Sequence, residues 1–219
     1  MIRHTQGETM IKLLVADNKK LEDNDILAAF KNNNIEIAKQ VESSEEVLSS
    51  VKAEQPDVVL MSLSIGGNGA FEAIDQLRMN YPRVGIVLML IHSDGPFPRR
   101  LLETGASGFV SKNTAASDIA QAIVEVKNRE KYISPEIAQK IAISLLPGGE
   151  VSPLDRLSER EMQVMLQLSQ GESPLQISSR LALSPKTVST YKHRVRDKLR
   201  VDDTQEIYAL AGSHGLVYR

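Results

Sequence analysis

The sequence contains no cysteine, which excludes disulfides, thiolate metal sites and cysteine nucleophiles. No apolar run approaches the roughly 18 residues that a membrane span requires. The first ten residues, MIRHTQGETM, lack the apolar core of a signal peptide, and residues 1–9 are interpreted as a disordered leader. These absences fit a chain without a membrane partner in a reducing cytoplasm.

Signs of enzymatic chemistry are also missing. We find no cluster of metal ligands, no nucleophile–base pair and no phosphate-binding loop. The four histidines, His4, His92, His193 and His214, have no spacing typical of ligands. We therefore expect no enzyme, no metal site and no cofactor.

Charge is nearly balanced but unevenly spread. The formal net charge is −2, whereas residues 150–219 carry 10 Lys/Arg against 9 Asp/Glu. Residues 186–200 hold six basic side chains and a single acid, Asp197. Such a stretch is usually a solvated helix face, and it indicates nucleic-acid binding only where the fold presents it to a groove.

The first half of the chain alternates short apolar runs with helical patterns. The runs predict strands at 11–17, 35–41, 57–61, 85–91 and 108–110. Between and after them, the spacing of apolar residues predicts helices, including a short one over 97–106. Three of the runs are uniformly apolar, which is typical of strands buried on both faces of a parallel sheet. We predict an α/β domain with a five-stranded, doubly wound parallel sheet, whose sites lie at the carboxyl ends of the strands.

Polar and charged residues follow several of these strands. The residues at the carboxyl ends are Asp17, Asn18, Ser62, Leu90 and Lys112. One acid and one lysine would also be explained by an incidental surface ion pair.

Across roughly residues 10–129 the order of these residues resembles the receiver domain of bacterial response regulators. In that family an acidic pair ends the first strand, a phosphate-accepting Asp the third and a Ser/Thr the fourth, and a Lys follows the fifth. By position, this chain keeps Asp17 and Lys112, the latter in the context GFVSK. It has Asn18 for the second acid, Ser62 for the acceptor and Leu90 for the hydroxyl, and Gly66 replaces a loop proline.

These departures change the chemistry that the resemblance implies. A hydroxyl needs a base before it can attack phosphorus, and Mg²⁺ prefers carboxylate oxygens. We expect a degenerate phosphorylation pocket, in which Lys112 pairs with Asp17 and Ser62 is a structural replacement and additional hydrogen-bond partner. The alternative is a Ser62 that still accepts phosphate from a kinase.

The second half is predicted to be small and helical. We divide the chain into the leader, a receiver-like domain (10–130), a linker helix with its linker (131–153) and a helical domain (154–219). Ser158 and Glu161 form a capping-box pattern. Two short helices joined by LALS favour a helix-turn-helix, although an ordinary four-helix bundle would also fit.

The helix beginning at SPKTV is the predicted DNA reader. Its apolar face holds Val188, Tyr191, Val195 and Leu199. The opposite face supplies the base-facing candidates Lys186, Ser189, Thr190 and His193. The candidates for the edge of the core or for phosphate contact are Tyr191, Lys192, Arg194 and Arg196.

Residues 154–217 resemble the LuxR/NarL-type helix-turn-helix through LSERE, ISSRLALSPKTV and HGLV. With PFPRRLLETGASGF and KYISPEIAQ, the whole chain resembles the GacA/UvrY/SirA group of NarL/FixJ response regulators. In members with an intact pocket, the group implies a sensor kinase and control of small regulatory RNA genes. We expect a dimeric, double-stranded-DNA-binding transcriptional regulator that acts without aspartyl phosphorylation. The alternatives are a protein that sequesters other response regulators and a conventional regulator with an unusual acceptor.

Overall fold

The computed structural model describes residues 10–65, 69–91, 98–214 and 216. The predicted leader, Gly66 and His92 lie outside the described residues. Within them, no helix combines the length and apolar character that a membrane span requires.

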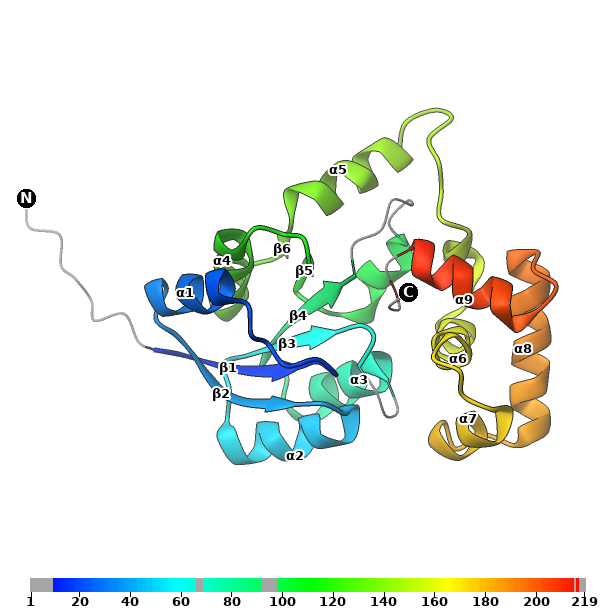
Figure 1. Cartoon of the computed structure of the whole chain (residues 1–219), viewed down its shortest axis with the longest axis horizontal. Coiled ribbons are helices and arrows are strands. Elements are labelled where there is room, and N and C mark those ends of the chain that lie inside the picture. The colour runs from blue at the N-terminus through cyan, green and yellow to red at the C-terminus, as the bar shows by residue number, and fades with distance from the viewer. Residues whose placement is uncertain (1–9, 66–68, 92–97, 215, 217–219) are drawn as a thin grey trace, which may run out of the picture.

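The N-terminal half is built on one parallel sheet (Figure 1). Its order is β2-β1-β3-β4-β5-β6, so the sheet has six strands and the prediction of five was wrong. The strands are β1 (Ile11–Ala16), β2 (Ile35–Val41), β3 (Val58–Ser62), β4 (Gly85–Leu90), β5 (Gly108–Ser111) and β6 (Tyr132–Ile133).

The sixth strand is a two-residue extension of the sheet edge. The Tyr132 amide donates to the Ser107 carbonyl at 3.0 Å, and the Ser134 amide donates to the Phe109 carbonyl at 2.9 Å. Two residues are too few to show a strand period in the sequence, which is why this segment was assigned to the linker.

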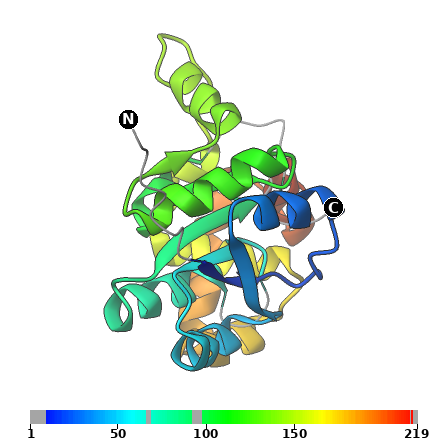
Figure 2. The same ribbon diagram turned by 90° about the vertical axis from the view of Figure 1, so that its left-hand side faces the viewer.

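Helices cover both faces of the sheet, as the uniformly apolar strands require. One face carries α1 (Asn24–Asn32) and α4 (Ala116–Lys127), and the other carries α2 (Ser44–Glu54) and α3 (Ala70–Asn80) (Figures 1 and 2). Side chains of alternate residues along each strand fill two apolar cores. The predicted helix at 97–106 is a 3₁₀ helix, η1 (Arg99–Thr104).

The C-terminal half is helical. A linker helix, α5 (Pro135–Ser144), leads to η2 (Pro153–Arg156) and then to α6 (Glu159–Ser169), α7 (Pro174–Arg180), α8 (Pro185–Leu199) and α9 (Thr204–Ser213). The capping box at α6 is confirmed, since the Glu161 amide donates to Ser158 Oγ and the Ser158 amide donates to Glu161 Oε2. A second capping box, at Ser173 and Gln176, was not predicted.

Candidate functional site

The carboxyl edge of the sheet brings together residues that are far apart in the sequence. Asp17 follows β1 and Lys112 follows β5, 95 positions later. Lys112 Nζ lies 2.5 Å from Asp17 Oδ2, with side-chain exposures of 24% and 5% respectively. Asp17 Oδ1 accepts a further hydrogen bond, from the Lys19 amide at 3.2 Å. The carboxylate that a divalent cation would need is thus already bonded to a cation and an amide, while Asn18 beside it is exposed.

Ser62 is the last residue of β3, and its exposed fraction is 0%. Its Oγ lies 2.9 Å from Ser64 Oγ and accepts from the Ser64 amide at 3.4 Å. A tight turn, in which the Ile65 amide donates to the Ser62 carbonyl, holds the two serines together. Ser62 thus has a partner that was not predicted, Ser64, and the expected bond between Ser62 and the Asp17–Lys112 pair stays a prediction. The pattern SLS, with a second hydroxyl two residues on, was the signal for this partner.

Leu90 ends β4 and is 4% exposed within an apolar cluster. Its carbonyl accepts from the Lys112 amide at 2.8 Å, so its main chain supports the edge of the pocket. Its side chain has no group that could bond a phosphoryl oxygen.

The described residues at this edge support neither activation of the Ser62 hydroxyl as a nucleophile nor metal binding. No described base contacts the Ser62 hydroxyl, whose bonding is to another serine. Among the described residues, no group of three or more His, Asp or Glu side chains is placed to bind a metal ion.

The other candidate surface is α8. Val188, Val195 and Leu199 are buried and Tyr191 is half-buried, so the predicted inner face is confirmed. Ser184 caps the helix by accepting from the Thr187 amide at 3.1 Å.

The outer face of α8 is polar and basic. Lys186, Ser189, Thr190, His193 and Arg194 are exposed, and Lys192 is half-buried. Ser189 and Thr190 donate to carbonyls one turn back in their own helix, each at 3.0 Å, and their oxygens remain able to accept bonds from DNA bases. His193 lies 3.4 Å from Asp197 on the same exposed face.

Two basic side chains of α8 have structural partners. The Arg196 guanidinium donates to the Asp202 carbonyl in the connection to α9. Lys198 Nζ lies 2.6 Å from Glu161 Oε2, the same carboxylate oxygen that caps α6. Lys198 was not among the predicted contacts, whereas Arg196 was a candidate for the edge of the core or for phosphate contact and is half-buried.

Two family models match the chain. The response regulator receiver domain matches residues 13–124, and the luxR family of bacterial regulatory proteins matches residues 155–211. The response regulator GacA of Pseudomonas syringae pv. syringae (strain B728a) is 38% identical over 210 residues, which cover 95% of this chain and 98% of GacA. The chain is a response regulator of the GacA/UvrY type.

Further relatives agree. The response regulator UvrY of Escherichia coli (strain K12) is 34% identical over 209 residues, covering 94% of the regulator and 96% of UvrY. RcsB from Salmonella enterica serovar Typhimurium, bound to the promoter rprA in the presence of phosphomimetic BeF3−, has a TM-score of 0.73 at 19% identity, covering 93% of the regulator and 99% of RcsB. That similarity shows a shared fold. By its two family models and its curated relatives, the regulator is a DNA-binding two-component response regulator, a member of a family of transcription factors.

Proposed function

We propose that this response regulator controls transcription without aspartyl phosphorylation of its receiver. The observation that carries the proposal is the state of the acceptor position: Ser62 is fully buried and its hydroxyl is bonded to Ser64. A receiver aspartate attacks as a carboxylate that is already ionised at neutral pH, whereas a serine hydroxyl needs a base to activate it.

The rest of the pocket supports the same proposal. Lys112 and Asp17 neutralise each other at 2.5 Å, and the described residues form no group of carboxylates for Mg²⁺ to neutralise. Leu90, in the place of the family's hydroxyl, cannot report on a phosphoryl group. The receiver then serves as a dimerisation or protein-docking domain.

The DNA contacts are proposed for the outer face of α8. Its N-terminal half would enter the major groove, with Lys186, Ser189, Thr190 and His193 toward base edges. Tyr191, Lys192, Arg194 and Arg196 are the candidates for phosphate contact or the edge of the core. Since one small helix-turn-helix offers few contacts, we propose a homodimer on paired half-sites. A related solved structure is of two RcsB dimers bound to two parallel DNAs.

The test is to incubate the wild type and Ser62→Asp with acetyl phosphate and Mg²⁺. Intact mass, DNA affinity and, by size exclusion with light scattering, oligomeric state are then measured. We expect unmodified wild type, a dimer at tens of micromolar and unchanged DNA binding. Ser62→Asp alone should not become switchable, because Asn18 weakens the metal site and Leu90 cannot sense the phosphoryl group.

Each rival has its own signature in this test. A stably phosphorylated wild type with tighter DNA binding would show a conventional regulator with an unusual acceptor. Failure of the purified protein to bind DNA, together with pairing to intact regulators, would show a sequestering protein. A monomer both free and on DNA would contradict the proposed dimer.

A further inference from the structure

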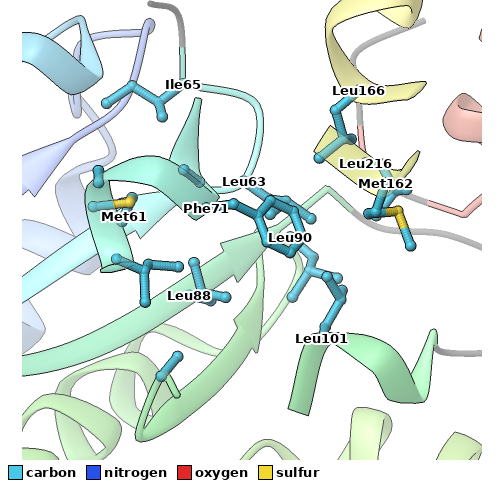
Figure 3. Close-up of a cluster of buried hydrophobic side chains, with 14 of the residues drawn as sticks. Met61, Leu63, Ile65, Phe71, Leu88, Leu90, Leu101, Met162, Leu166 and Leu216 are labelled. Atoms are coloured by element: carbon cyan, nitrogen blue, oxygen red, sulfur yellow. The ribbon is translucent and has the colours of Figure 1, made fainter. Parts of the chain in front are cut away.

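Helix α6 is buried on every side along most of its length. Every residue from Glu161 to Ser169 is buried, although a helix in a four-helix domain normally leaves one stripe to solvent. Helices α8 and α9 cover one side of α6. The residues that cover the other side come from the receiver (Figure 3).

The receiver side of this contact is formed by apolar residues near the carboxyl ends of β3 and β4 and by residues of α3 and η1. Leu63 follows β3, Phe71 lies in the first turn of α3, Leu90 ends β4 and Leu101 lies in η1, and all four are buried. Figure 3 shows these side chains directed toward Met162 and Leu166 of α6 and toward Leu216. We call these seven residues the interdomain seam.

A cavity of about 10 Å³ lies between Leu63 and Phe71 on one side and Leu166 on the other. That is room for no more than about one water molecule. At the rim, Arg99 Nε of η1 lies 3.5 Å from Asp155 Oδ2 of η2, which adds an ion pair between the two halves.

With the seam closed, α8 lies on the side of the helical domain that faces away from the sheet (Figure 1). Its outer residues Lys186, Thr190 and Arg194 are accordingly exposed. The contact between the domains therefore leaves the candidate DNA-reading face open.

We propose that Leu90 closes an apolar seam that fixes the two domains in one arrangement, with the DNA-reading face of α8 turned outward. This inference rests on the proposed function and deepens it, because a fixed arrangement takes the place of a phosphate-driven one. The residue in the family's sensing position is then a packing residue between domains. A hydroxyl there would be buried among apolar side chains, where an unpaired polar group is unfavourable.

The absence of native cysteines allows a direct measurement of this arrangement in the full chain. Spin labels are attached to cysteines introduced at Met79 of α3 and Leu175 of α7, which are 79% and 70% exposed. Pulsed electron resonance then reports the distance between the two domains. We expect a single narrow distribution for the wild-type background, both with and without DNA.

Two seam variants should open the arrangement. Leu90→Ser and Leu166→Ser each remove one buried aliphatic side chain, which should lower the ratio of docked to undocked molecules by about 10- to 100-fold and broaden the distribution. Leu27→Ser on α1 makes the same chemical change away from the seam and should leave the distribution narrow. Circular dichroism verifies that each variant is folded, and the variant on α6 remains informative if Leu90→Ser disrupts the receiver.

A broad distribution in the wild-type background would overturn the proposal. So would a narrow distribution retained by folded Leu90→Ser or Leu166→Ser. The proposed function fails differently, through phosphorylation detected by mass. A phosphorylated protein with an unchanged narrow distribution would preserve the seam and refute the silent receiver.

Discussion

At the carboxyl edge of the receiver sheet, Asp17, Lys112 and Ser62 are bonded within the protein, whereas the polar groups on the outer face of α8 face solvent. Asp17 bonds Lys112 and Ser62 bonds Ser64, all within the protein. On α8, Lys186 and Arg194 are exposed, and no described residue pairs with their charged groups. The charged groups on the outer face of α8 are therefore available to a ligand, whereas Asp17, Lys112 and Ser62 already have partners within the protein.

Under the proposed function, this difference follows from the absence of a reacting carboxylate at Ser62. A buried polar group that no longer has a ligand must find an internal partner, because leaving it unpaired is unfavourable. An exposed cation needs no such partner, since water solvates it. In the proposed function, the internal bonding of Ser62 corresponds to a structural role, and the exposed charges of α8 correspond to DNA contacts.

The largest effect on stability is expected from removing one partner of the Asp17–Lys112 ion pair. Lys112→Met leaves the Asp17 carboxylate, 5% exposed, without its cation. We expect the free energy of unfolding to fall by about 3 kcal/mol in urea titrations at pH 7, because an uncompensated buried charge is left behind. The matched double variant Asp17→Asn with Lys112→Met should recover most of that loss. An unchanged urea midpoint for the single variant would show that water solvates the carboxylate.

A smaller effect, on DNA binding, is expected from substitutions on the outer face of α8. Thr190→Ala should weaken specific DNA binding by about 1–3 kcal/mol and blur sequence preference, because it removes a base-facing group. Arg194→Ala should weaken binding to all sequences alike and reduce the salt slope by about one unit. Neither change should alter the free energy of unfolding by more than about 0.5 kcal/mol.

Gel-shift titrations at several salt concentrations separate these two classes. Lys52→Ala on α2 is the matched control, since it removes an exposed charge from the receiver. Equal losses for Arg194→Ala and Lys52→Ala would mean that binding follows net charge, and no loss for either α8 variant would contradict the assignment of the face.

Sequence reasoning was most successful where one residue type decides the outcome. Uniformly apolar runs predicted the central strands, and the spacing from Val188 to Leu199 predicted the inner face of α8. The Asp17–Lys112 pair followed from strand order, since carboxyl ends of parallel strands share one edge.

The features that sequence reasoning missed depend on a partner that no local pattern specifies. The sixth strand forms because Tyr132 and Ile133 pair with the edge of β5. Ser62 prefers Ser64 because a turn brings the two together. Leu90 was identified as a lost hydroxyl, but its place in the interdomain seam depends on Met162 and Leu166, about seventy residues further along.

The last effect concerns Glu161 of α6. Its partner Lys198 is a basic residue of α8 that is bonded within the protein, unlike Lys186 and Arg194. Burial alone would raise the pKa of the Glu161 carboxyl. The hydrogen bonds from Lys198 and from Ser158 outweigh burial and lower the pKa below its ordinary value. A lowered pKa means that the ionised form stabilises the fold, so this contribution is present above pH 4.5 and is lost as the pH falls through the folded-state pKa.

Glu161→Gln should therefore cost about 1–2 kcal/mol of unfolding free energy at pH 7, through the weakened cap and the lost bond to Lys198. Once the pH has fallen below the folded-state pKa of Glu161, the wild type and the variant should converge, because the wild-type carboxyl is then protonated. Urea titrations over a series of pH values measure this difference. Lys198→Met leaves the cap intact but the buried Glu161 carboxylate without its cation, so it should also lower the free energy of unfolding at pH 7, with unchanged specificity in the gel shifts. If Lys198→Met instead reduced the salt slope as Arg194→Ala does, Lys198 would belong to the outward face and the division of α8 into bonded and DNA-facing basic residues would be wrong.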